Sequence, residues 1–255
     1  KAMDNSGAII GPLLAFAVLY FFPFNYRYVF ILATIPAILG VFTLFFLVKE
    51  ARRKKESLSS KINFRSFPKR FYVFLGIAFV FALGNSTDAL LLVKANDVGV
   101  KVAYIPVVYL IFNSVSVFFA IPLGTRSDKI GRERLIITGY LLYALVYLGF
   151  GYTNHIGAVI GLFALYGLYS AFTDGVQKAL VSDLIDKDKQ GTGLGIYNSL
   201  LGLTLLPASI IAGFLYDKVN NSAPCYFGAA MALMAAACML VFYYGGRKHE
   251  NTVLI

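Results

Sequence analysis

The sequence contains no tryptophan, only 2 cysteines and 2 histidines, and few charged residues. Charged side chains make up 14% of the chain, whereas a soluble domain carries about 25%. Hydrophobic residues make up 58%, and the mean hydropathy is +0.71. The apolar residues lie in long blocks, and runs of about 18 or more are typical of membrane spans. The composition therefore excludes most soluble classes of protein.

The scarce cysteines and histidines are badly placed for a metal or cofactor site. Cys225 and Cys238 both lie in the last apolar block without a C-x-x-C spacing, so no disulfide is predicted. His155 and His249 are far apart, and each lies in a polar stretch. The spans contain no histidine cluster, paired acids or nucleophile–base arrangement, which argues against an enzyme. We expect no cofactor and no metal.

Eight nearly uncharged blocks predict an all-α membrane protein with about eight transmembrane helices. Each block can cross roughly 30 Å of hydrocarbon as a helix that rises 1.5 Å per residue. Helices are expected because lipid offers backbone groups no hydrogen-bond partners. The predicted spans are 6–24, 28–48, 71–93, 103–125, 135–154, 156–173, 192–216 and 221–246.

The basic residues are distributed unevenly between the loops. The net charge of +10 could suggest nucleic acid, but the charges lie in short loops between apolar blocks, so nucleic acid is not an expected partner. When alternate loops are assigned to opposite sides, 19 of the 23 Lys and Arg residues fall on one side. The positive-inside rule then predicts a multi-pass protein of the plasma or inner membrane, with both termini of this chain cytoplasmic.

The longest loop, Lys49 to Arg70, is strongly basic. It can be a solvated linker near anionic headgroups and also the boundary between two helical bundles. We therefore predict four segments: the end of a first bundle (1–48), a basic cytoplasmic linker (49–70), a six-helix bundle (71–246) and a cytoplasmic tail (247–255).

The loop after the fourth span carries the most specific motif, Gly-Thr-Arg-Ser-Asp-Lys-Ile-Gly-Arg-Glu-Arg from position 124. Two glycines permit a tight reversal between helices. A carboxylate among arginines can form charge-assisted hydrogen bonds that hold one conformation. The alternative is an ordinary basic loop. The spacing resembles the G-x-x-x-D-[RK]-x-G-R-[RK] signature of the major facilitator superfamily, in the copy between helices 8 and 9. The predicted conformational-switch residues are Gly124, Asp128, Lys129, Gly131, Arg132 and Arg134.

The first span is similar to the fifth-helix motif of drug/proton antiporters in the same superfamily. Gly7 and Gly11 would give a flat face for close helix contact, and Pro12 would kink the helix. Ala15 and Phe16 stand where the antiporter motif has two glycines. The alternative is simple helix packing through G-x-x-x-G.

Together the two resemblances set the register of the helices. If the first span is family helix 5, the basic linker follows helix 6 and the eight spans end at helix 12. The resemblance then implies that family helices 1 to 4 belong to a longer parent. We expect this chain alone not to transport.

Asp88 is the acidic residue that the predicted spans place well within the membrane, close to Asn85 in family helix 7. Intramembrane carboxylates are costly and usually face a cavity, which suits proton binding. The alternative is that Asp88 caps a helix or pairs with Lys94 near the membrane surface.

The resemblance implies that family helices 7, 8, 10 and 11 line a central cavity. Polar residues in these spans are candidates for cavity or coupling roles; the alternative is that they hydrogen-bond neighbouring helices. Most of the 17 Tyr and 23 Phe residues are expected in interfacial belts and packing. The candidates are Asn85, Asp88, Asn113, Tyr166, Asp174, Tyr197 and Asn198.

The resemblance implies a secondary active transporter of a small organic solute that works by alternating access, with proton-coupled efflux as the leading hypothesis. The expected partners are the lipid bilayer, the solute and protons. One alternative is an uptake symporter for a metabolite or nutrient. Another is a non-transporting membrane sensor on the same fold.

Overall fold

The computed structural model describes residues 2–22, 26–47, 67–86 and 88–253, and these contain helices and no strand. The predicted all-α class is confirmed. Two 3₁₀ turns, Val102–Tyr104 and Lys187–Lys189, accompany the α-helices. The α-helices are α1 (Ala2–Phe21), α2 (Tyr26–Leu47), α3 (Lys69–Gly84), α4 (Ala89–Asp97), α5 (Ile105–Ile130), α6 (Arg132–Tyr152), α7 (Ile156–Asp183), α8 (Gln190–Lys218) and α9 (Ala223–Val253).

By length and composition, seven helical segments of the described chain could cross a membrane. They include α2, the α3–α4 pair taken together, and each helix from α5 to α9. A shorter apolar stretch, Gly7–Phe21, lies within α1. These eight segments correspond to the eight spans predicted from the sequence, so the membrane-spanning bundle is confirmed.

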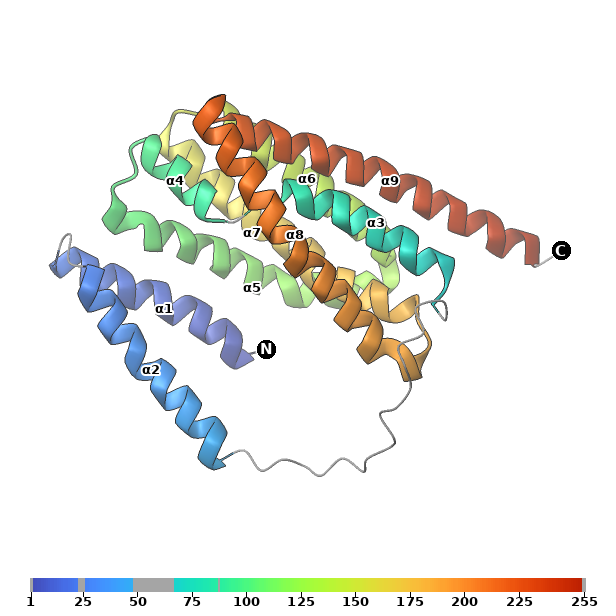
Figure 1. The fold of residues 1–255 in the computed structure, drawn as a ribbon, viewed down its shortest axis with the longest axis horizontal. Helices are drawn as coiled ribbons and strands as arrows, with labels where there is room; N and C mark the ends of the chain where they lie inside the picture. The colour runs from blue at the N-terminus through green and yellow to red at the C-terminus, as the bar shows by residue number, and fades with distance from the viewer. Residues whose placement is uncertain (1, 23–25, 48–66, 87, 254–255) are drawn as a thin grey trace.

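Helices α3 to α9 form one bundle, and α1 and α2 lie along one side of it (Figure 1). Helix α1 packs on α5, and the rings of Phe16 and Tyr104 are 5.8 Å apart where it meets the turn before α5. The core of the bundle is centred on α6, which packs against both α7 and α9. Tyr140, Tyr143 and Phe150 of α6 are fully buried.

Helices α5 and α7 approach closely at Gly167. A β-carbon at this position would overlap the carbonyl oxygen of Phe112 and lie 3.0 Å from the β-carbon of Val115. Small residues at helix interfaces allow such backbone contact in membrane bundles. Gly167 therefore lets α7 lie directly on α5.

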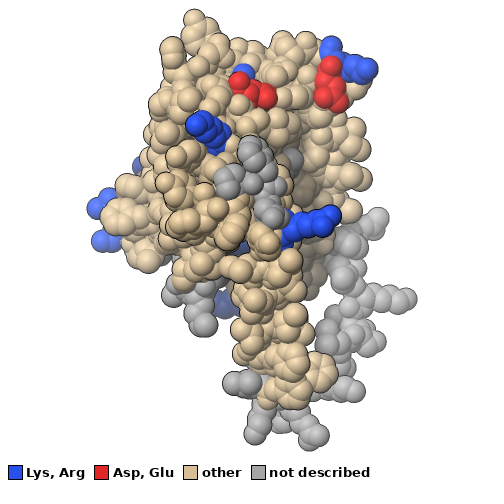
Figure 2. Space-filling model, turned by 90° about the vertical axis from the view of Figure 1, so that its left-hand side faces the viewer, with Lys and Arg blue, Asp and Glu red and all other residues tan. Residues whose placement is uncertain are grey.

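The two ends of the bundle differ in charge. One end contains the start of α3, the α5–α6 turn and the α7–α8 connection. We call it the basic end because these segments carry Lys69, Arg70, Arg126, Lys129, Arg132, Arg134, Lys178, Lys187 and Lys189. The opposite end contains the α4–α5, α6–α7 and α8–α9 turns, and Figure 2 shows few charged side chains on it.

The span predicted over 71–93 is present, but it is not one unbroken helix. Helix α3 ends at Gly84, and α4 begins at Ala89. Asn85 leaves the helical conformation, with φ −92° and ψ 77°. The run Asn85-Ser86-Thr87-Asp88 consists of short polar residues, whose side chains compete for backbone hydrogen bonds and weaken a helix.

The predicted loop at 124–134 is also shorter than expected. Helix α5 continues to Ile130, so Gly124 is helical and makes no turn. Gly131 alone joins α5 to α6, with φ +97°, a conformation that side chains with a β-carbon rarely adopt. The reversal that the sequence assigned to two glycines is made by one.

Candidate functional site

The break between α3 and α4 lies against α6 and α7. The last carbonyl groups of a helix have no partner within the helix. The Tyr143 hydroxyl of α6 donates to the Gly84 carbonyl at 3.0 Å and lies 3.4 Å from Oδ1 of Asn85. On the other side, Nδ2 of Asn85 lies 3.5 Å from the Tyr169 hydroxyl of α7. The Tyr143 hydroxyl thus replaces one missing helical partner at the end of α3, and the Tyr169 hydroxyl accepts from the Asn85 side chain.

Asp88 occupies the N-cap position just before α4, where its side chain makes no capping hydrogen bond, and it is half-buried. Its Oδ1 accepts a hydrogen bond of 2.7 Å from the Tyr166 hydroxyl of α7. The alternative pairing with Lys94 is not formed, because Lys94 Nζ donates instead to Ser222 Oγ at 3.0 Å. The predicted candidates Asn85, Asp88 and Tyr166 are therefore brought together in one place.

An aromatic cluster surrounds the break. Phe81 stacks on Tyr140 with ring centroids 4.1 Å apart. Tyr143 stacks on Tyr147 at 4.0 Å and meets Tyr169 edge to face at 4.8 Å. Tyr166 also stacks on Phe112 of α5 at 5.0 Å. The aromatic cluster, as named from here on, comprises Phe81, Phe112, Tyr140, Tyr143, Tyr147, Tyr166 and Tyr169.

The sequence analysis assigned most tyrosines to interfacial belts and packing and singled out Tyr166 in this cluster. It did not predict that Tyr140, Tyr143, Tyr147 and Tyr169 pack around the break. The signal was their spacing: positions 140, 143 and 147 lie on one face of a helix, as do 166 and 169. Among the described residues, the buried hydroxyls of Tyr140 and Tyr147 have no hydrogen-bond partner. Such groups are rare in native structures and are typical of functional sites or water positions.

A second polar group lies towards the basic end of α7. Asp174 Oδ2 accepts a hydrogen bond of 2.6 Å from Ser170 Oγ, and Ser170 Oγ lies 3.0 Å from Ser116 Oγ of α5. These residues line a cavity of about 290 Å³ between α5 and α7. One helical turn further, Gln177 accepts a hydrogen bond of 2.5 Å from the Tyr197 hydroxyl of α8. Asp174 is thus a residue of α7, and Tyr197 of α8 contacts the same helix.

Several other predicted residues do not join either group. Asn113 Nδ2 donates to the Tyr109 carbonyl of its own helix at 2.9 Å. Asn198 is exposed on α8. A β-carbon on Gly7 or Gly11 would meet nothing within 4 Å among the described residues, so the predicted close contact at these two glycines is absent there. Pro12 lies inside α1.

The signature segment 124–134 connects four helices at the basic end. Arg132 forms an ion pair of 2.6 Å with Asp183 of α7 and donates to the Ala179 carbonyl. Arg134 Nε donates to the Tyr243 hydroxyl of α9 at 2.8 Å. Glu133 lies 3.7 Å from Arg70 of α3.

These contacts attach the start of α6 to the ends of α3, α7 and α9. Lys129 is exposed, and the side chain of the predicted Asp128 lies outside the described residues. A rearrangement of α6 would therefore break or change the contacts that Arg132 makes with α7 and that Arg134 makes with α9.

A broken helix next to a half-buried carboxylate can bind an ion or a polar solute within a membrane. Unwound backbone in transporters is tolerated where it lines a cavity or is buried in protein. Here the Asp88 carboxylate accepts a hydrogen bond from the Tyr166 hydroxyl, whose ring stacks on Phe112. The carboxylate can take up a proton, and the carboxylate and the aromatic rings together can attract an organic cation.

Known proteins resemble this chain over most of its length. It is 32% identical over 246 residues to an uncharacterised MFS-type transporter of Methanocaldococcus jannaschii, which covers 94% of this chain and 62% of the relative. It is 24% identical over 226 residues to an uncharacterised protein of Mycobacterium tuberculosis, covering 85% of this chain and 55% of that protein. Multidrug resistance protein 2 of Bacillus subtilis is 26% identical over 170 residues, covering 65% and 40%.

The chain thus spans 62% and 55% of the lengths of these first two relatives. The sequence model of the Major Facilitator Superfamily matches residues 73–253, which include the broken helix, the aromatic cluster and the signature segment. This chain of membrane-spanning helices belongs to the Major Facilitator Superfamily.

Proposed function

We propose that this chain supplies family helices 5 to 12 of a secondary active transporter, which moves a small organic solute by alternating access and exports it in exchange for protons. The two bundles rock about a site near the membrane midplane, with α1 and α2 ending the first bundle and α3 to α9 forming the second. The basic end faces the cytoplasm.

One observation carries this proposal: the interruption of α3–α4 at Asp88, beside the aromatic cluster. Asp88 is bonded to Tyr166 rather than to a lysine, and among the described residues its carboxylate forms no ion pair. A carboxylate without a counter-ion inside a membrane protein is suited to bind and release a proton during a transport cycle.

The direction of transport is proposed from two further features. Gly7, Gly11 and Pro12 resemble the fifth-helix motif of drug/proton antiporters. One similar protein is named as a multidrug resistance protein. Both features favour export of the solute over uptake.

The test uses the full-length protein that contains this chain, reconstituted into proteoliposomes. We expect counterflow of at least one compound from a panel of metabolites and lipophilic drugs. An imposed proton gradient should drive that compound against its own gradient. Flux of a metabolite in the same direction as the protons would instead identify an uptake symporter.

A second measurement separates transport from sensing. A cysteine placed at Asn198, which is exposed on α8, reports access from each side of the membrane. We expect the compound to shift its labelling from one side to the other. Binding of a compound with neither flux nor a change in labelling would identify a non-transporting sensor and refute the proposal.

A further inference from the structure

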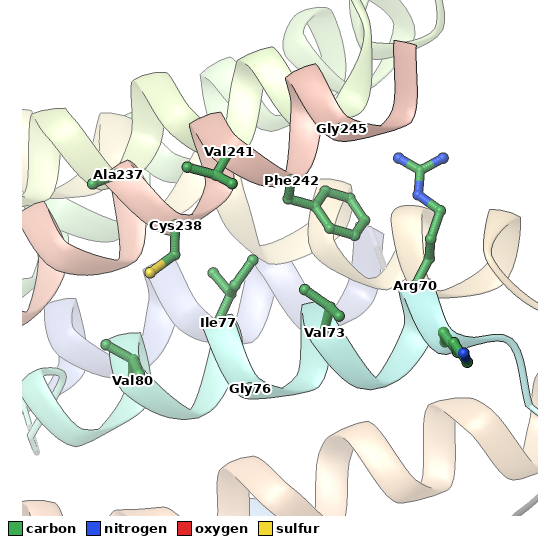
Figure 3. A pocket seen from close by; sticks show the side chains of 11 residues that line it. Arg70, Val73, Gly76, Ile77, Val80, Ala237, Cys238, Val241, Phe242 and Gly245 are labelled. Atoms are coloured by element: carbon green, nitrogen blue, oxygen red, sulfur yellow. The ribbon is translucent and has the colours of Figure 1, made fainter. Parts of the chain in front are cut away.

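An open groove lies between α3 and α9, away from the candidate site. It has a volume of about 700 Å³, which is within the size range of pockets that hold drug-sized ligands. Figure 3 shows its walls, which are formed by side chains of α3 and α9. Except for two cations, the lining consists of apolar residues and glycines, including Val73, Ile77, Val241 and Phe242.

The floor of the groove is packed, whereas its rim is open. Ile77 and Phe242 are buried at 4% and 7% exposure, and Val73 and Val241 are exposed at 53% and 73%. A β-carbon on Gly76 or Gly245 would meet nothing within 4 Å among the described residues. The groove is therefore apolar and open along the bundle surface.

Two cationic side chains lie at one end of this groove. Lys69 and Arg70 begin α3 at the basic end, and both line the groove. The Arg70 guanidinium lies 4.6 Å from the centre of the Phe242 ring and 3.7 Å from Glu133, and its side chain is 47% exposed. Seven more Lys and Arg residues precede this pair in the sequence between positions 49 and 65.

The position of the groove points towards lipid. Helix α9 lies along one edge of the bundle, and α1 and α2 lie along the other (Figure 1). In the arrangement proposed above, the first bundle covers the side of α1, so the α3–α9 surface faces the bilayer. The apolar part of the groove suits an acyl chain, and the two cations at its basic end suit an anionic headgroup.

We propose that the α3–α9 groove is a binding site for an anionic phospholipid of the leaflet at the basic end. One acyl chain lies along Val73, Gly76 and Val241, and the phosphate contacts Lys69 and Arg70. A zwitterionic lipid fits the same groove, but the two cations attract its headgroup less strongly. This site is independent of the transported solute and of the direction of transport.

The test uses phosphatidylglycerol with a photoreactive acyl chain, added to the purified full-length protein in nanodiscs. We expect crosslinks in the peptides that contain 73–80 and 237–245. Unlabelled phosphatidylglycerol should compete better than phosphatidylcholine. Removing one cation by Lys69→Gln or Arg70→Gln should reduce that preference by roughly fivefold.

Two variants separate groove filling from general damage. Gly76→Leu places a side chain in the open groove, where a β-carbon would meet nothing within 4 Å. It should reduce crosslinking about fivefold or more. Gly157→Leu adds the same side chain at the opposite end, where a β-carbon also meets nothing, and should leave crosslinking unchanged.

A control for charge is Glu133→Gln, which removes the anion beside Arg70 and keeps both cations. It should retain or increase the preference for phosphatidylglycerol. Equal competition by the two lipids, or crosslinking that survives Gly76→Leu, would overturn the proposed site. Neither result would affect the proposed transport, which is measured by flux.

Discussion

At the scale of single residues, the tyrosine hydroxyls distinguish bonded from unbonded positions within one cluster. Tyr166 donates to Asp88, and Tyr140 has no partner among the described residues, although both side chains are buried. A Tyr→Phe substitution at each position therefore separates the effect of losing this hydrogen bond from the effect of losing a buried hydroxyl.

We predict that Tyr166→Phe lowers the stability of the full-length protein by about 1.5–3 kcal/mol, because a carboxylate loses a hydrogen bond. Tyr140→Phe should be neutral or stabilising, because it removes a buried hydroxyl that has no partner. Thermal unfolding in detergent measures both. Equal destabilisation by the two variants would show that the bond to Asp88 is not special.

A second pair of residues tests the signature segment. Gly131 has φ +97°, whereas Gly124 is helical and has open space around it. Gly131→Ala should destabilise the protein by about 1–3 kcal/mol through backbone strain. Gly124→Ala should be neutral or stabilising by up to about 1 kcal/mol, because alanine favours the helix. Thermal unfolding that ranks the two variants in reverse would contradict the assigned turn.

At the scale of helices, the close approach of α5 and α7 depends on Gly167. A methyl group there would overlap the Phe112 carbonyl, whereas the same change at Gly161 on the same helix meets nothing. We predict that Gly167→Ala lowers the free energy of unfolding by about 1–3 kcal/mol and that Gly161→Ala does not lower it. Spin labels on α5 and α7 should show a larger separation in Gly167→Ala alone. An unchanged separation and stability would argue against direct packing at this point.

The helix boundaries show what a sequence can and cannot reveal at this scale. Apolar length predicted where the spans lie, because every span must cover the same thickness of hydrocarbon. The interruption at Asn85–Asp88 was missed, since the flanking blocks together have the length of one span. The continuation of α5 to Ile130 was also missed, because charged residues can extend a helix beyond the membrane boundary.

At the scale of the whole molecule, the bundle and its charge asymmetry were predictable, and the candidate site was only partly so. Asp88, Tyr166 and Asp174 were identified because polar groups are rare in spans. The aromatic cluster was not, because residue spacing gives the face of a helix but not the helix that it meets. Gly167 likewise had no sequence signal that separated it from Gly161.

The most direct test of the central claim is proton-driven flux in proteoliposomes of the full-length protein, compared between wild type, Asp88→Asn and Asp188→Asn. Asp188 is exposed in the connection between α7 and α8, so its substitution controls for the loss of a carboxylate. We predict that Asp88→Asn abolishes the response to a pH gradient while solute exchange continues, and that Asp188→Asn behaves as wild type. A full response to the pH gradient in Asp88→Asn would contradict the proposed coupling site.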